Sequence, residues 1–153
     1  MSEHLSVLER EIQELLQRTG PDSKFPPNCF IAMKGEFVQY VSRQSLTVSF
    51  PVLDESLNPL WNMQGGFLVA AFDNVFGPLS YLAARRPCVT LTLNTEFIRP
   101  VVRGDRLKVS AKVISRSKEV LHLEGNAFDS REKLVATSSA TVIVARDQPP
   151  SAS

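Results

Sequence analysis

The sequence predicts an α+β fold in which one long, curved antiparallel sheet wraps around a single apolar helix. Residues 65–84 are apolar on almost every side, which is typical of a helix buried in a core. Four segments with alternating apolar and polar residues then follow, at 88–99, 105–116, 119–128 and 133–145, and this period of two indicates strands. Several of these strands are longer than the usual run of about 5–6 residues, so we expect the sheet to curl around the helix.

The segments before the central helix predict one further helix and one or two strands. Apolar residues recur at helical spacing over residues 3–18, and Gly20-Pro21 is a stop signal, so an N-terminal helix is expected there. Residues 21–29 form a proline-rich connection. Residues 30–42 and 44–53 are rich in Phe, Ile, Val and Thr, which favours two strands or one bent strand.

Two local features qualify these elements. Gly35 is expected to mark a β-bulge between the two early strands. Gly77-Pro78 lies inside the central helix, where a proline removes one backbone hydrogen bond and clashes with the preceding turn. We therefore expect a kink or a break at that point.

The length of 153 residues fits a single domain, divided here into an N-terminal helix (1–20), one domain (30–145) and a disordered tail (146–153). The hydrophobic content of 43% and charged content of 22% are ordinary for a soluble protein. A net charge of +1 gives no reason to expect nucleic-acid binding. The chain shows no signal core and no apolar run of about 18 residues, so we expect a cytoplasmic protein that does not enter a membrane.

The two cysteines and two histidines show no metal-ligand spacing, so no metal site is expected. Basic residues are unevenly distributed: nine lie between Arg85 and Lys118, opposed there only by Glu96 and Asp105. Such a basic region suits an anionic ligand, but it equally suits a solvated sheet face. The sequence leaves both interpretations open.

The most informative stretch runs from Asn58 to Asp73 and reads N-P-L-W-N-M-Q-G-G-F-L-V-A-A-F-D. Asp73 is the only charged residue of the apolar segment before Arg85. Burying an ionised carboxylate costs several kcal/mol unless it is paired or solvated. We therefore expect Asp73 to have a chemical role.

This stretch is followed by V-T-L-T-L-N-T-E-F-I-R-P from Val89 and by a Gly104-Asp105 turn. In this order and spacing, the segments resemble the hotdog-fold acyl-CoA thioesterases of the phenylacetic-acid-degradation (PaaI-like) type. The resemblance covers roughly residues 30–145 and implies a hotdog fold. It also implies hydrolysis of a small or aromatic acyl-CoA to the free acid and CoA, with the thioester as substrate and no further cofactor.

The resemblance implies a role for five residues in catalysis. Asp73 would act as general base or nucleophile, and the Gly65 N–H would donate to the oxyanion, with Gln64 beside it. Asn58 would bind water or the thioester carbonyl, although a plain turn asparagine is the alternative. Thr90 would position the nucleophilic water from a neighbouring subunit, so that Asp73 faces a neighbour's Thr90.

The remaining implied residues bind the substrate. Gly66 lets the substrate approach the backbone closely. Arg99, Arg116, Ser117 and Lys118 are candidates for the phosphates of CoA, which suit arginine and lysine. Candidates for the acyl pocket are four apolar residues: Phe30, Met33, Phe37 and Phe67.

Two positions depart from the family pattern, since Gln64 stands in place of a histidine and Trp61 in place of a glycine. Glutamine can donate a hydrogen bond but cannot shuttle a proton, which leaves Gln64 an orienting or polarising role. These departures motivate an alternative, a non-catalytic hotdog protein that binds acyl-CoA as a sensor or interaction module. A hydratase or dehydratase is disfavoured because residues 58–73 contain no histidine.

Assembly follows from the predicted sheet. A single curled sheet leaves an open edge strand that must be covered. By resemblance to other hotdog proteins, we expect a homodimer or homotetramer with sites at the subunit interfaces.

Overall fold

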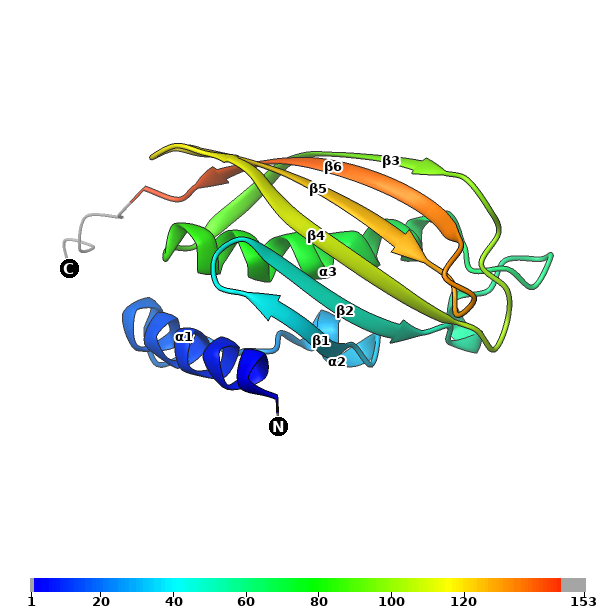
Figure 1. Ribbon diagram of the computed structural model, residues 1–153, viewed down its shortest axis with the longest axis horizontal. Helices are drawn as coiled ribbons and strands as arrows, with labels where there is room; N and C mark the ends of the chain where they lie inside the picture. The colour runs from blue at the N-terminus through cyan, green and yellow to red at the C-terminus, as the bar shows by residue number, and fades with distance from the viewer. Residues whose placement is uncertain (1, 147–153) are drawn as a thin grey trace.

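The computed structural model describes residues 2–146 and shows one six-stranded antiparallel sheet curved around one long helix (Figure 1). This confirms the predicted α+β hotdog architecture. The predicted disordered tail falls mainly on residues 147–153, which lie outside the described residues. The elements are α1 (Glu3–Thr19), α2 (Asn28–Ala32), β1 (Glu36–Val41), β2 (Ser45–Pro51), the 3-10 turn η1 (Asp54–Ser56), α3 (Gly65–Ala84), β3 (Cys88–Phe97), β4 (Arg106–Arg116), β5 (Val120–Phe128) and β6 (Leu134–Val144).

The strands lie in the order β1-β2-β4-β5-β6-β3, with every neighbouring pair antiparallel. The strand that follows α3 in sequence, β3, is therefore placed at one edge of the sheet, paired only with β6. The other edge is β1, which α1 covers on one side (Figure 1). The free edge of β3 runs beside α3, and this places an unpaired strand next to the central helix.

The central helix α3 is the core of the molecule. Phe72, Val75 and Phe76 are completely buried against the concave face of the sheet. Gly125 of β5 permits this close approach, because a Cβ there would lie 3.0 Å from the Phe76 ring and 3.1 Å from Phe72. By length and composition α3 would also be apolar enough to cross a membrane, but most of it is buried inside this molecule.

Pro78 does not interrupt the helix. α3 continues from Gly65 to Ala84 through the proline, so of the predicted kink or break the break is wrong, and a kink stays a prediction. Residues on both sides of Pro78 are buried in the same core, and this packing stabilises the helix despite the lost hydrogen bond. The Ser80 hydroxyl donates to the Gly77 carbonyl at 2.7 Å and adds a local contact at this point.

The segment predicted as a strand from residue 30 begins differently. Residues 28–32 form the short helix α2, and β1 starts only at Glu36. Gly35 is not a bulge: a Cβ there would lie 2.6 Å from the Phe30 ring, so glycine lets α2 fold back under the chain. The irregularity in the pairing of β1 with β2 lies instead between Phe37 and Gln39.

Helix α1 is confirmed and packs on the core through Leu8 and Ile12. Its Glu11 carboxylate accepts hydrogen bonds from the Tyr40 and Ser42 hydroxyls, both at 2.5 Å. Burial, and then the hydrogen bond to Glu11, raise the pKa of Tyr40 above its ordinary value. The phenol therefore stays protonated and acts as a donor that joins β1 to α1.

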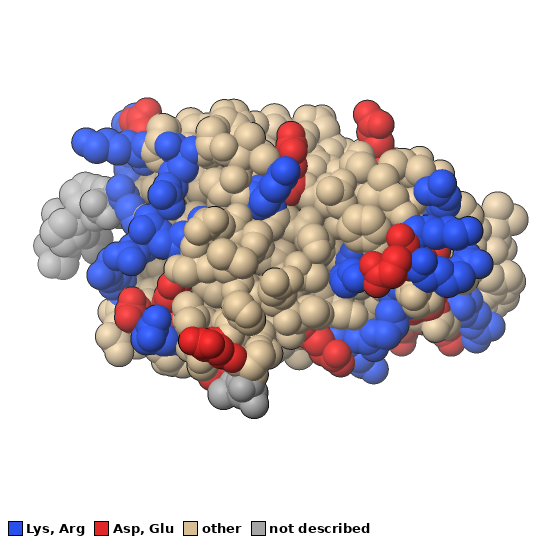
Figure 2. Space-filling view, in the orientation of Figure 1, with Lys and Arg blue, Asp and Glu red and all other residues tan. Residues whose placement is uncertain are grey.

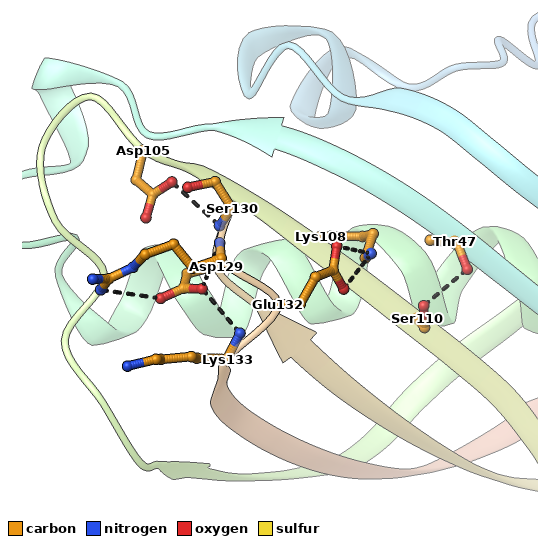
Figure 3. A network of polar contacts seen from close by, with 9 residues as sticks. Thr47, Asp105, Lys108, Ser110, Asp129, Ser130, Glu132 and Lys133 are labelled. Atoms are coloured by element: carbon orange, nitrogen blue, oxygen red, sulfur yellow. Dashed lines mark hydrogen bonds and ion pairs between the residues drawn. The ribbon is translucent and has the colours of Figure 1, made fainter.

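The turn between β5 and β6 is held by one buried carboxylate, as Figure 3 shows. Asp129 accepts the backbone N–H groups of Arg131 at 2.9 Å and Lys133 at 3.0 Å. These hydrogen bonds, the one from Lys133 first, lower the pKa of Asp129. Beside the turn, Lys108 of β4 forms an ion pair with Glu132 at 2.6 Å, which fixes the turn onto the sheet.

Candidate active site

The first backbone N–H groups of α3 differ in whether they have an acceptor. The N–H groups of Phe67 and Leu68 both donate to the Gln64 carbonyl. Within residues 2–146, no group accepts a hydrogen bond from the Gly65 or Gly66 N–H. Both donors lie at the positive end of the helix dipole, which favours an anion or a developing oxyanion.

Neighbouring side chains explain why glycine occupies both positions. A Cβ at Gly65 would lie 3.1 Å from the Phe97 ring, and a Cβ at Gly66 would lie 2.8 Å from Oε1 of Gln64. The Gln64 carboxamide is therefore folded back over the first helical turn, beside the free donors. Phe97 is a contact that we did not predict, although the strand pattern beginning at Val89 contains this phenylalanine.

Asn58 organises the turn that leads into α3. Its Oδ1 atom accepts the backbone N–H groups of Leu60 at 2.9 Å and Asn62 at 3.1 Å. These two hydrogen bonds support the alternative interpretation, in which Asn58 is a structural residue of the turn. Only the amide nitrogen of Asn58 remains to contact a ligand.

Asp73 lies two turns further along α3 and is exposed, which corrects the expectation of a carboxylate buried among apolar neighbours. It shares an uncovered strip of α3 with Gly66 and Gly77, because the sheet ends at β3 and does not extend over this face. The sequence could not reveal this strip, since the order of strands in the sheet decides which face of α3 is covered.

Within residues 2–146, the Asp73 carboxylate has one side-chain partner. The Thr90 hydroxyl of β3 donates to Asp73 Oδ1 at 3.0 Å. The register of β3 against β6 shifts between Thr90 and Thr92, so the side chains do not alternate regularly between the two faces of the sheet from Thr90 to Thr92. This Thr90 belongs to the same chain as Asp73, and the contact with a neighbour's Thr90 stays a prediction.

A cavity of about 370 Å³ lies beside the start of α3. Met33 and Phe67, two of the candidates for the acyl pocket, line it, and their role in binding an acyl group stays a prediction. Phe30 is instead buried in the core, where it stacks on Phe37 with ring centroids 4.8 Å apart. The complete lining is Ala32, Met33, Lys34, Pro51, Leu53, Glu55, Ser56, Met63 and Phe67.

The predicted CoA-binding residues lie at two ends of the molecule. Arg99 lies two residues after Phe97, whose ring is beside Gly65, and its guanidinium donates to the Leu134 carbonyl at 2.6 Å. Arg116 instead donates to the Ala83 carbonyl at the far end of α3, roughly 27 Å from Gly65 along the helix axis.

The other two predicted CoA contacts lie at the same far end as Arg116. Ser117 accepts the backbone N–H groups of Glu119 and Val120 in the β4–β5 turn. Lys118 lines an open groove at the end of the sheet. Within one chain, Arg116, Ser117 and Lys118 are therefore separated from the glycine pair.

Charge is concentrated at both ends of the face seen in Figure 2, with few charged side chains between them. At one end, several of the basic residues counted in the sequence are neutralised by carboxylates from other segments. These ion pairs are Arg103–Asp54, Arg106–Glu36 and Lys108–Glu132. At the other end, where α3 finishes, Arg43 and Arg116 both donate to the Ala83 carbonyl.

In the described part of the chain, no three His, Cys, Asp or Glu side chains are placed to hold a metal ion. The absence of a metal and of a bound cofactor remains a prediction. Cys88 is buried, and burial raises the pKa of its thiol, which disfavours the nucleophilic thiolate.

The curved sheet, the buried central helix and the free amides at its start define a hotdog protein of the thioesterase type. The family model of the thioesterase superfamily matches residues 62–136. A Ralstonia eutropha protein described as a phenylacetic acid degradation-related thioesterase is 30% identical, with a TM-score of 0.73. The match covers 88% of this chain and 99% of that one. The chain belongs to the thioesterase superfamily, and it is a thioester hydrolase.

Two further structures share the fold at lower identity. The Escherichia coli PaaI protein of the phenylacetic acid degradation operon is 18% identical, with a TM-score of 0.78 over 90% of this chain and 95% of that one. A Streptococcus mutans protein solved with acetyl-CoA is also 18% identical, with a TM-score of 0.71 over 84% of this chain and 97% of that one.

Proposed function

We propose that this thioesterase hydrolyses a small or aromatic acyl-CoA to the free acid and CoA, in a cytoplasmic reaction that needs no metal or further cofactor. The observation that carries the proposal is the exposed Asp73 carboxylate, which accepts a hydrogen bond from Thr90 on a strip of α3 that its own sheet leaves uncovered. An acidic side chain in this position is available to act on a bound thioester.

The chemistry is divided between the two parts of α3. Asp73 removes a proton from an attacking water, or attacks the thioester carbonyl itself, and Thr90 orients the carboxylate. The Gly65 N–H stabilises the oxyanion of the tetrahedral intermediate, with the Gln64 amide as a second donor. In the general-base route, collapse of the intermediate breaks the C–S bond, the proton taken up by Asp73 passes to the CoA thiolate, and the free acid is left. In the nucleophilic route, collapse expels the CoA thiolate and leaves an anhydride between Asp73 and the acyl group, which water hydrolyses to the free acid and the Asp73 carboxylate, with a proton released to the thiolate.

Geometry supports a site that two subunits share. Gly65 and Asp73 lie roughly 12 Å apart along the helix axis. This distance is too long for Asp73 to attack a carbonyl held at Gly65 of the same chain. The edge strand β3 also exposes Val89, Leu91 and Phe97. We infer that β3 pairs with β3 of a second copy, giving a homodimer or a tetramer of such dimers.

This pairing would also bring together the predicted CoA contacts. We take the two β3 strands as antiparallel, about a two-fold axis perpendicular to α3, so that the C-terminal end of one α3 lies toward the N-terminal end of the other. Arg116, Ser117 and Lys118 of one subunit would then approach the same ligand as Arg99 of the other. The Streptococcus mutans protein, which has the same fold and binds acetyl-CoA, supports a CoA ligand here.

The cavity beside α3 is the proposed acyl pocket. Its lining includes Met63 and Phe67, the residues on either side of the Gln64-Gly65-Gly66 segment. Its volume of about 370 Å³ falls within the usual range for small-ligand sites. A small or aromatic acyl chain would fit in this cavity while its carbonyl contacts the Gly65 N–H.

The test is a panel of acyl-CoA thioesters, short, long and aromatic, with thiol release measured for the wild type and for Asp73→Asn. The proposal predicts turnover of at least one small or aromatic thioester, and loss of that turnover in the variant. Preference for long acyl chains would overturn the proposed substrate class. Binding of acyl-CoA by calorimetry without any thiol release would overturn the reaction.

A further inference from the structure

Trp61 is the only tryptophan in the chain, and its side chain is 61% exposed. It lies near the tip of the turn that precedes α3, closed by the bridge between Leu57 and Met63. Its φ of 61° is in the left-handed region, which a bulky side chain rarely adopts and which glycine would adopt without cost. An exposed indole in this conformation contributes nothing to the core, so its presence calls for another role.

The indole is nevertheless held firmly. The backbone N–H of Trp61 donates to the Asn58 carbonyl at 2.9 Å, and its own carbonyl accepts from the Arg103 N–H at 3.2 Å. The Arg103 guanidinium lies over the ring, 5.1 Å from its centroid. That guanidinium is itself fixed by two 3.1 Å hydrogen bonds to Asp54. One face of the ring is thus occupied by a positioned cation.

The rest of the indole is largely exposed, since 61% of Trp61 is accessible to solvent. No aromatic ring within residues 2–146 stacks on Trp61. Trp61 also lies only four residues before Gly65, a separation of at most roughly 14 Å. A pre-oriented, exposed indole at this distance from the proposed oxyanion donor is positioned to contact a substrate.

We propose that the free face of Trp61 stacks on an aromatic ring of the substrate, so that Trp61 is a binding residue of the thioesterase reaction. The inference rests on the proposed function, because it takes an acyl-CoA as the ligand. Two groups of an acyl-CoA could provide the aromatic ring that stacks on Trp61: the adenine of CoA and an aromatic acyl group. Arg103 on the other face makes the indole a fixed platform for either ring.

Because Trp61 is the sole tryptophan, its fluorescence reports on this residue alone. The titrants are CoA, which carries adenine only, the S-phenacyl thioether of pantetheine, which carries an aromatic ring but no adenine, and an S-alkyl pantetheine thioether, which carries neither. None of the three can be hydrolysed. Quenching by CoA assigns the ring to adenine, and quenching by the phenacyl compound assigns it to the acyl group. The S-alkyl compound should leave the fluorescence unchanged.

Steady-state kinetics give the second measurement. For substrates with the stacking ring, Trp61→Gly should raise KM about tenfold with kcat retained, since stacking contributes to binding. Trp61→Phe keeps a ring and should restore most of the affinity. Leu60→Ala, at the exposed neighbouring position, is the matched control and should leave KM unchanged. Thermal melting of Trp61→Gly should show an intact fold, because glycine accepts the observed φ.

The inference is overturned if neither ring-bearing titrant changes the fluorescence, or if Trp61→Gly leaves KM unchanged for every thioester hydrolysed. Failure of the proposed function gives a different result. In that case no acyl-CoA is hydrolysed by the wild type, while quenching by the two ring-bearing titrants can still be measured.

Discussion

The Thr90 hydroxyl donates a 3.0 Å hydrogen bond to Oδ1 of Asp73, and this contact joins the edge strand β3 to the uncovered strip of α3. Asp73 makes no other side-chain hydrogen bond or ion pair within residues 2–146. One carboxylate oxygen is therefore oriented by the protein, and the other is available to a water or a substrate.

Thr90→Val should lower kcat/KM about 10- to 100-fold, because hydrogen bonds to charged groups contribute about 1.5–3 kcal/mol. Valine keeps the shape of threonine but loses the donor, so the thermal midpoint should hardly change. Thr90→Ser should recover most of the activity. Thr92→Val, on the same strand, is the control, and equal kinetics for the two valine variants would contradict the role of Thr90.

Gln64→Glu should lower kcat about 100-fold, since it replaces an amide donor beside the oxyanion with a carboxylate. Gln64→His retains a donor and should stay active. Gln39→Glu introduces the same charge at an exposed position of β1 and serves as the control. If Gln64→Glu and Gln39→Glu have the same kcat, Gln64 does not face the reacting carbonyl.

Leu91→Lys should convert the assembly to monomers, because a lysine on an edge strand opposes pairing with another strand. Sedimentation velocity measures the change, and activity should fall with it if two subunits share the site. Val38→Lys places the same residue on the opposite edge strand, β1, and should leave the assembly intact. A wild-type protein that sediments as a monomer while active would exclude the shared site.

Asp129→Asn should destabilise the fold at neutral pH and much less in acid. The native-state pKa of Asp129 is lowered by backbone hydrogen bonds, so its contribution is fully present above the unfolded-state value of about 3.9. That contribution is lost as pH falls through the native-state pKa. Urea unfolding at several pH values should show the difference between wild type and variant closing in acid. Asp22→Asn, at an exposed position, should show no such trend.

The sequence predicted the large elements because their signals are local. The apolar surface of residues 65–84 and the alternation along the later strands report directly on burial. The short helix α2 was missed because its five residues are too few for a helical period and include Phe30 and Ile31, which favour strands. The lack of a break at Pro78 depends on tertiary packing, which no local signal contains.

The candidate site divides in the same way. The order of Asn58, Gln64, Gly65 and Asp73 along the chain was enough to predict the helix start and its free donors. The exposure of Asp73 depends on β3 being the last strand of the sheet, which is a property of topology. The separation of Arg116 from Gly65 likewise depends on the length and direction of α3 in the folded chain.

The role of Asp73 is tested most directly by kcat of the Asp73→Asn variant on the best acyl-CoA substrate, measured beside Asp22→Asn. Asparagine keeps the shape of the side chain but cannot act as base or nucleophile, and general-base catalysis alone contributes about 10²- to 10⁴-fold. We predict a fall in kcat of about 1,000-fold with an unchanged thermal midpoint. An Asp73→Asn enzyme that turns over at the wild-type rate would contradict the proposed mechanism.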